Sequence, residues 1–246
     1  MSPFGLNLCS RYAYPPNSLS LCGPDKKNDL MWYTNRLKPD RGTEDILIQF
    51  STLYPYLRLI AKENNIRDPF NPEVVEAYWI GNRLLSAIPL SRFAEHLSEN
   101  LRLKKKLTYK DLNRLYSKLP LGAVPHHAFH VMNVYKRTGN VDLPQTVETM
   151  DACIINWGTV KEKSAISIIV ETKPIRLVGS QLKFSQPIRR TLIPQGDSDR
   201  VFNTIKVGDR ISYHWGMVCT KLNQKEINNL TYYTNLSMKL ANLISS

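Results

Sequence analysis

The chain has 246 residues, 42% of them apolar, which is enough to bury a full core in one or two domains. It has no apolar run near the roughly eighteen residues of a membrane span and no signal peptide, so we expect a cytoplasmic protein without a membrane partner. It has no Cys-x-x-Cys pair, so we expect neither a disulfide framework nor a zinc ribbon. The net charge of +12 suits an anionic ligand or an acidic protein partner. We do not expect nucleic acid as a partner, because the only tight basic run, Lys104-Lys105-Lys106, has no interleaved aromatic residues.

The first segment carries Cys9, Arg11, Tyr14 and Cys22 around the pair Pro15-Pro16. Because proline lacks an N–H and restricts the residue before it, two successive prolines predict an extended or turning segment. A loop with these side chains is chemically rich, so Arg11 and Tyr14 are candidates to bind a partner or anion, and Cys9 and Cys22 are candidate metal ligands. The alternative is a loop that its aromatic residues pack on the helices.

Residues 25–120 form a predicted all-α region without a glycine-rich phosphate loop or an internal repeat. Capping residues and apolar periodicity predict helices from Asp25 to about Leu37, from Thr43 to Ile60 with a kink at Pro55, from Asn71-Pro72 to Gly81, and over 91–103 and 108–119.

Three histidines follow this region, at positions 126, 127 and 130. In a helix, His126 and His130 would share one face, and His127 would lie beside His130. Such pairs bind metals, with Cys9 or Cys22 as a possible third ligand, and the alternative is a hydrogen-bonded structural cluster. A predicted linker at Gly139-Asn140 and Pro144 then separates a mostly α-helical domain at 1–145 from a second domain at 150–246.

From Asp151 onward the pattern changes to short, β-branched segments bounded by turns, at 154–160, 166–171, 174–178 and 210–215. In the last segment, alternation places His214 on the face opposite Ile211 and Trp215. These strands suit a small Greek-key barrel of the OB type. The expected fold class is therefore α+β, an N-terminal all-α domain followed by an OB-like β-barrel and a C-terminal helix.

Two ungapped motifs in the second half carry a resemblance. Val207-Gly208-Asp209, His214, Gly216 and Lys221-Leu222 keep the spacing V-G-D-x-[VL]-x-x-H-x-G-[FW]-[AV]-x-x-[KR]-[LI], and upstream Cys153, Gly158 and Val160 keep the spacing of an opening cysteine, glycine and valine. The region from Asp151 to Ser246 thereby resembles hydrogenase assembly chaperones of the HypC type. The whole chain is also similar to an uncharacterised prokaryotic family associated with nickel-iron hydrogenase genes, through its RYAYPPN, CGP and PHHAFH segments.

The resemblance implies a non-catalytic maturation factor or accessory subunit of a nickel-iron hydrogenase. Its cargo would be iron carrying cyanide and carbonyl ligands, and its partner the hydrogenase large subunit or an iron-inserting assembly protein. By the same resemblance, Cys153 would be the iron ligand and tether, and His214 the second ligand or its hydrogen-bond partner. Lys161 and Lys163 would lower the pKa of the thiol and attract an anionic iron group, and Trp157 and Trp215 are further candidates for partner contacts.

One difference from that family concerns the cysteine itself. The family's cysteine becomes N-terminal and offers a free amine, whereas Cys153 offers only an amide, and Ile155-Asn156-Trp157 replaces the usual Gly-Ile-Pro. Either the module no longer carries iron, or the N-terminal domain supplies the missing donor through Cys9, Cys22 or His127. The alternative function is a metal- or cysteine-dependent enzyme whose site lies in the N-terminal domain.

Overall fold

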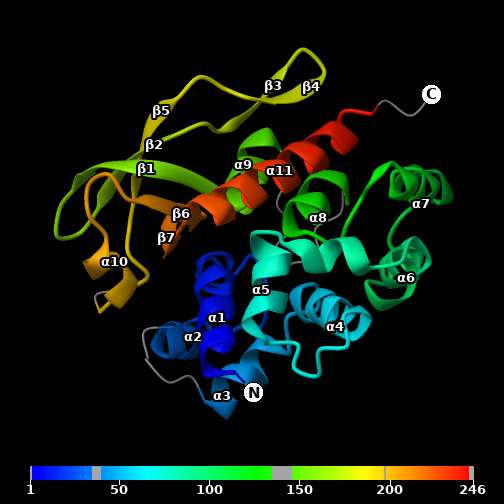
Figure 1. Cartoon of the computed structure of the whole chain (residues 1–246), viewed down its shortest axis with the longest axis horizontal. Coiled ribbons are helices and arrows are strands. Elements are labelled where there is room, and N and C mark those ends of the chain that lie inside the picture. The colour runs from blue at the N-terminus through cyan, green and yellow to red at the C-terminus, as the bar shows by residue number, and fades with distance from the viewer. Residues whose placement is uncertain (1, 35–39, 135–145, 197, 244–246) are drawn as a thin grey trace.

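The structure, a computed structural model, describes residues 2–34, 40–134, 146–196 and 198–243, so the predicted linker at Gly139-Asn140 and Pro144 lies outside the described residues. Helices dominate the first part of the chain and strands the second, and a long helix closes the fold (Figure 1). The helices are α1 (Pro3–Ser18), α2 (Lys27–Thr34), α3 (Arg41–Leu47), α4 (Leu53–Glu63), α5 (Pro72–Trp79), α6 (Leu90–Glu95), α7 (Tyr109–Tyr116), α8 (His127–Asn133), α9 (Val147–Cys153), α10 (Arg200–Thr204) and α11 (Gln224–Ala241). Single helical turns lie at Arg83–Ala87, His96–Asn100, Leu103–Lys105 and Leu119–Leu121.

Helix α1 corrects the prediction of an extended N-terminal segment. The side chain of Ser2 caps the helix by accepting from the Gly5 N–H, and Pro3 occupies the first turn, where its missing N–H costs nothing. Pro15 and Pro16 lie in the last turn but do not end the helix. The local rule fails here because the carbonyl groups that these prolines leave without a donor are bonded by the side chains of Gln195, which follows β5, and His214, at the end of β6.

The predicted helix from Thr43 to Ile60 is two helices, α3 and α4. Asp40 begins α3, since its carboxylate accepts from the N–H groups of Gly42 and Thr43, and Pro55 lies in the first turn of α4 rather than at a kink. The helix predicted from Asn71-Pro72 is confirmed as α5, with the Asn71 side chain 2.9 Å from the Glu73 N–H. The predicted end of α2, Leu37, lies outside the described residues.

The strands are β1 (Asn156–Lys163), β2 (Ile168–Thr172), β3 (Ile175–Val178), β4 (Gln181–Phe184), β5 (Ile188–Leu192), β6 (Arg210–His214) and β7 (Met217–Lys221). Five of them form an antiparallel sheet in the order β5-β2-β1-β6-β7, and β3 and β4 form a separate ribbon. The sheet edges meet at one parallel bridge, between Ile193 and Met217. The α+β class is confirmed, but no continuous ladder closes a barrel within the described residues, so the OB-like barrel is not confirmed.

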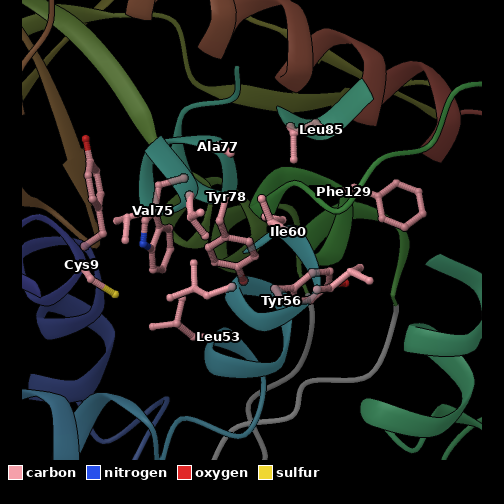
Figure 2. Packing of buried hydrophobic residues seen from close by; sticks show 14 of the residues in the cluster. Cys9, Leu53, Tyr56, Ile60, Val75, Ala77, Tyr78, Leu85 and Phe129 are labelled. Carbon is pink, nitrogen blue, oxygen red and sulfur yellow. The ribbon is translucent and has the colours of Figure 1, made fainter. Parts of the chain in front are cut away.

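The main hydrophobic core joins the helices to the strands. It contains Tyr56 and Tyr78 from α4 and α5, together with Cys219 from β7 and Leu230 from α11. Figure 2 shows Tyr56 and Tyr78 side by side in this core, with ring centroids 5.1 Å apart. Helix α11 crosses the molecule between α8 and the β3–β4 ribbon (Figure 1). The division into domains at 1–145 and 150–246 stays a prediction, and the core extends across that boundary.

A smaller core lies inside the sheet, from Val160 and Val170 to Ile211 and Val218. Strand β6 is buried on both faces, because Ile211, Ser212, Tyr213 and His214 are all buried, so the expected alternation between a core face and a solvent face is absent there. No helix in the described parts of the chain has the length and apolar character that crossing a bilayer requires.

Candidate metal centre

Cys153, His214 and His127 converge on one point from three separate elements. Cys153 is the last residue of α9, His214 the last residue of β6, and His127 the first residue of α8. One potential ligand atom from each, the sulfur or a ring nitrogen, lies within 4.8 Å of the other two. All three side chains line a cavity of about 90 Å³. Thiolate and imidazole are the donors that zinc, iron and copper sites use, so the arrangement can hold a metal ion.

The hairpin between β6 and β7 sets the position of His214. His214 pairs with Met217 across a two-residue loop in which Trp215 and Gly216 have φ angles of 49° and 77°. Left-handed conformations at both loop residues match the twist of the strands, which is why glycine is favoured there. The N–H of Trp215 donates to the carbonyl of Ala152 at 3.0 Å and so fixes the hairpin against the end of α9, next to Cys153.

The hydrogen bonds of His214 define which nitrogen is free. Its Nδ1 lies 2.8 Å from the carbonyl oxygen of Tyr12, and because a carbonyl only accepts, Nδ1 carries the proton. Its Nε2 is buried and makes no well-aligned hydrogen bond among the described residues, although the Cys153 carbonyl is close enough to the ring to affect its pKa. Burial lowers the pKa of His214 to about 4, against the opposing effect of the Tyr12 and Cys153 carbonyls, so the ring is neutral at pH 7. Neutral imidazole is the form that binds metals.

His127 is held by two hydrogen bonds. Its Nε2 lies 2.8 Å from the carbonyl oxygen of Cys153, and its Nδ1 lies 3.1 Å from the hydroxyl of Tyr78. Burial, reinforced by the nearby His214, lowers the pKa of His127 well below its usual value. Because the Cys153 carbonyl only accepts, Nε2 carries the proton, and Nδ1 holds the lone pair and accepts from the Tyr78 hydroxyl.

The cavity is otherwise mostly apolar and extends between α1, α4 and α8. Besides the three converging residues, it is lined by residues that include Cys22, His130, Phe50, Leu53, Val131, Met150 and Trp215. His130 is bonded at Nδ1 to the hydroxyl of Tyr56, 3.2 Å away, and burial lowers its pKa to about 4. Cys22 and His130 therefore face the same space as the cluster without belonging to it.

Two other predicted ligands lie elsewhere. Cys9 is fully buried beside Trp79, burial raises the pKa of its thiol, and it does not line the cavity. His126 caps α8, with its Nδ1 3.2 Å from the Ala128 N–H, and stacks on Tyr233. Because His126 precedes the helix instead of lying within it, the predicted i, i+4 pair with His130 does not form.

Arg11 and Tyr14 do not present a surface for a partner. The guanidinium of Arg11 is buried and bonds both carboxylate oxygens of Asp199, at 2.9 and 3.1 Å. It also donates to the backbone carbonyls of Val218 and Cys219. The ring of Tyr14 is buried in the main core. The prediction of partner or anion binding at Arg11 is corrected, because a carboxylate of this chain already occupies the guanidinium.

The two lysines proposed to act on Cys153 are engaged elsewhere and do not line the cavity. Lys161 pairs with Glu171 at 3.1 Å. The ammonium group of Lys163 donates to carbonyl groups at the end of α10, including that of Ile205 at 2.7 Å. Trp157 lies in a different groove, against Phe184 of the ribbon, with ring centroids 5.7 Å apart.

No sequence pattern indicated the three residues that hold His127, His214 and Arg11 in place. Tyr78 holds His127 from a position 49 residues away in the chain. The Tyr12 carbonyl orients His214 from 202 residues away, and Asp199 neutralises Arg11 from 188 residues away. Each contact is tertiary, so no local pattern could have indicated it.

Comparison with known proteins gives a family for the whole chain. No curated protein and no solved structure matches it. One family model matches residues 1–246, and its description is a family of unknown function, DUF6390. The chain therefore belongs to DUF6390.

Proposed function

We propose that this protein is a non-catalytic maturation factor or accessory subunit of a nickel-iron hydrogenase. In this proposal it holds iron between Cys153, His214 and His127, and it binds the hydrogenase large subunit or an iron-inserting assembly protein in the cytoplasm. The observation that carries the proposal is the convergence of these three side chains, from three elements, on one buried cavity. The HypC-type resemblance supports it, since it singles out Cys153 and His214 independently of their geometry.

The chemistry of the donors fits iron. A buried ring nitrogen without a hydrogen-bond partner among the described residues is costly unless something binds it, and Nε2 of His214 is such an atom. Sulfur and two imidazoles suit a soft, low-spin iron. The cavity of about 90 Å³ is several times the roughly 10–15 Å³ that one water needs, so iron with small ligands of its own fits beside the donors.

His127 can take the place of the amine group that distinguishes the HypC-type chaperones from this chain. Those proteins offer a free amine beside the cysteine, which Cys153 lacks. His127 offers Nδ1 as a nitrogen donor from the helical part of the chain, in exchange for the hydrogen bond from the Tyr78 hydroxyl, while its Nε2–H donates to the Cys153 carbonyl. We infer that it replaces the amine as the third donor.

The order of the strands supports an OB-like origin for the sheet. An OB-fold is a five-stranded, partly open Greek-key barrel. The order β5-β2-β1-β6-β7 together with the parallel bridge between Ile193 and Met217 is what such a barrel would give if it were open along one seam. This reading agrees with the fold that the resemblance implies.

Iron content and infrared bands of cyanide and carbonyl test the proposal. The protein is purified from cells that also express its hydrogenase genes, as wild type and as Cys153→Ser, His214→Gln and His127→Gln. We expect the wild type to carry iron with both sets of bands and each variant to lose most of the iron. His130→Gln is the matched control, because it changes a histidine of the same cavity outside the cluster, and it should retain the iron. Full iron in Cys153→Ser would contradict the proposal.

A second candidate, a metal- or cysteine-dependent enzyme, is favoured by the presence of Cys22 in the same cavity. That function predicts a tightly bound metal which Cys22→Ala abolishes and Cys153→Ser leaves in place. Adding Cys22→Ala to the set of variants above therefore separates the two functions.

A further inference from the structure

The carbonyl group of Tyr12 has no helical donor within α1. A carbonyl in a helix accepts from the N–H four residues later, or from the N–H three residues later in a tighter turn. For Tyr12 these residues are Pro16 and Pro15, and proline has no N–H. A buried carbonyl must be satisfied by another donor. Here that donor is Nδ1 of His214, at 2.8 Å.

This contact decides the protonation pattern of His214. A neutral imidazole carries one proton, and the Tyr12 carbonyl requires it on Nδ1. The lone pair is then on Nε2, the buried atom that has no hydrogen-bond partner in the described part of the chain. The ring belongs to the cluster that His214 forms with Cys153 and His127.

We propose that Pro15-Pro16 is a positioning element of the metal centre: by removing both helical donors from the Tyr12 carbonyl, the two prolines keep the lone pair of His214 on Nε2, available for a metal. The proposal rests on the metal centre proposed above and adds which nitrogen of His214 binds and what fixes it. It also assigns a role to the two prolines of the RYAYPPN segment, which do not take part in either function proposed above.

The neighbouring carbonyl provides an internal comparison. Pro15 also removes the donor four residues after Arg11, and the Arg11 carbonyl instead accepts from Nε2 of Gln195 at 2.7 Å. That side chain donates to the Val218 carbonyl as well and does not belong to the cluster. Restoring an N–H at position 15 therefore competes first with Gln195, whereas an N–H at position 16 competes with His214.

The test compares Pro16→Ala with Pro15→Ala in the full chain. The tautomer of His214 is measured without metal, by two-bond nitrogen–proton correlation on protein labelled with ¹⁵N-histidine, and His214→Gln assigns its signals. Cobalt(II) alone is the metal probe. We expect Nδ1–H in the wild type and in Pro15→Ala. In Pro16→Ala we expect a new population with the proton on Nε2 and about tenfold weaker cobalt binding, as for loss of other hydrogen-bond partners of metal ligands.

Both variants replace proline in a helix by alanine, the best helix former, so the fold should be retained. The proposal is overturned if wild-type His214 carries its proton on Nε2, or if Pro16→Ala and Pro15→Ala give the same tautomer and the same cobalt affinity as the wild type. Failure of the metal centre itself has a different outcome. In that case the wild type binds no cobalt, while the tautomer of the metal-free protein still decides whether the prolines position His214.

Discussion

Lowering the pH from 7.5 to 5.5 should strongly destabilise the protein, because all five of its histidines are buried. Burial lowers the pKa of His96 and His126 to about 3 and of His130 and His214 to about 4, and it lowers that of His127 well below the usual value. In the unfolded chain each has a pKa near 6.5. Since the folded pKa values are depressed, this stability is present above about pH 6.5 and is lost as the pH falls toward 4.

The size of the effect follows from proton linkage. Between pH 7.5 and 5.5, a histidine whose pKa is about 6.5 unfolded and 4 or less folded loses about 1.3 kcal/mol of stability. The four histidines with a folded pKa of about 3 or 4 together lose about 5 kcal/mol, and His127, whose pKa is also lowered by burial, adds to this loss. That loss is comparable with the whole stability of a typical protein, about 5–15 kcal/mol. The protein should therefore be close to unfolding, or unfolded, near pH 5.

Urea unfolding followed by tryptophan fluorescence at pH 7.5, 6.5 and 5.5 measures this loss. His130→Gln is a matched variant, because an amide can still bond the Tyr56 hydroxyl but takes up no proton, and it should reduce the loss by about 1.3 kcal/mol. A change below about 2 kcal/mol between pH 7.5 and 5.5 in the wild type would refute the reasoning, since the histidines would then be taking up protons without unfolding.

Two further predictions concern stability. Asp199→Ala should cost about 3–5 kcal/mol in urea unfolding, because it leaves the buried guanidinium of Arg11 without its counter-ion. Arg189→Ala, which removes an exposed ion pair, is the control and should cost less than about 1 kcal/mol, so equal losses would argue against a structural role for the buried pair. Gly158→Ala should cost about 1–3 kcal/mol, because the added Cβ would lie 2.6 Å from the carbonyl oxygen of Glu171 on the next strand, and an unchanged thermal midpoint would contradict that close approach.

Part of the site was predictable from sequence because it depends on local spacing. Gly208-Asp209 and Gly216 bound β6 and the turn after it, and they fix the position of His214 in its strand. The matching motif around Cys153 then indicated a partner for it. The histidine cluster pointed to the third donor, but spacing alone could not choose His127 from its neighbours, because the choice depends on where α8 begins.

The remaining features depend on tertiary contacts. Two adjacent prolines normally exclude a helix, and the rule failed at Pro15-Pro16 because side chains of Gln195 and His214 replace the missing backbone donors. The guanidinium of Arg11 is a group that often binds anions or partners, yet in the structure it bonds Asp199, which is far away in the chain. Short apolar strands likewise predict a sheet but not whether its edges close, which depends on a contact such as that between Ile193 and Met217.

The shared core bears on whether residues 150–246 could fold as a separate protein. In the HypC-type chaperones on which the proposed function draws, the corresponding module is a free-standing protein. Here Ile155, Cys219, Leu222, Ile227 and Leu230 pack into the same cluster as the helices. A fragment that begins at residue 150 would expose this apolar surface to water and would tend to aggregate. The two halves therefore cannot separate without exposing this surface, and any movement that the proposed release of iron requires has to take place while they stay packed together.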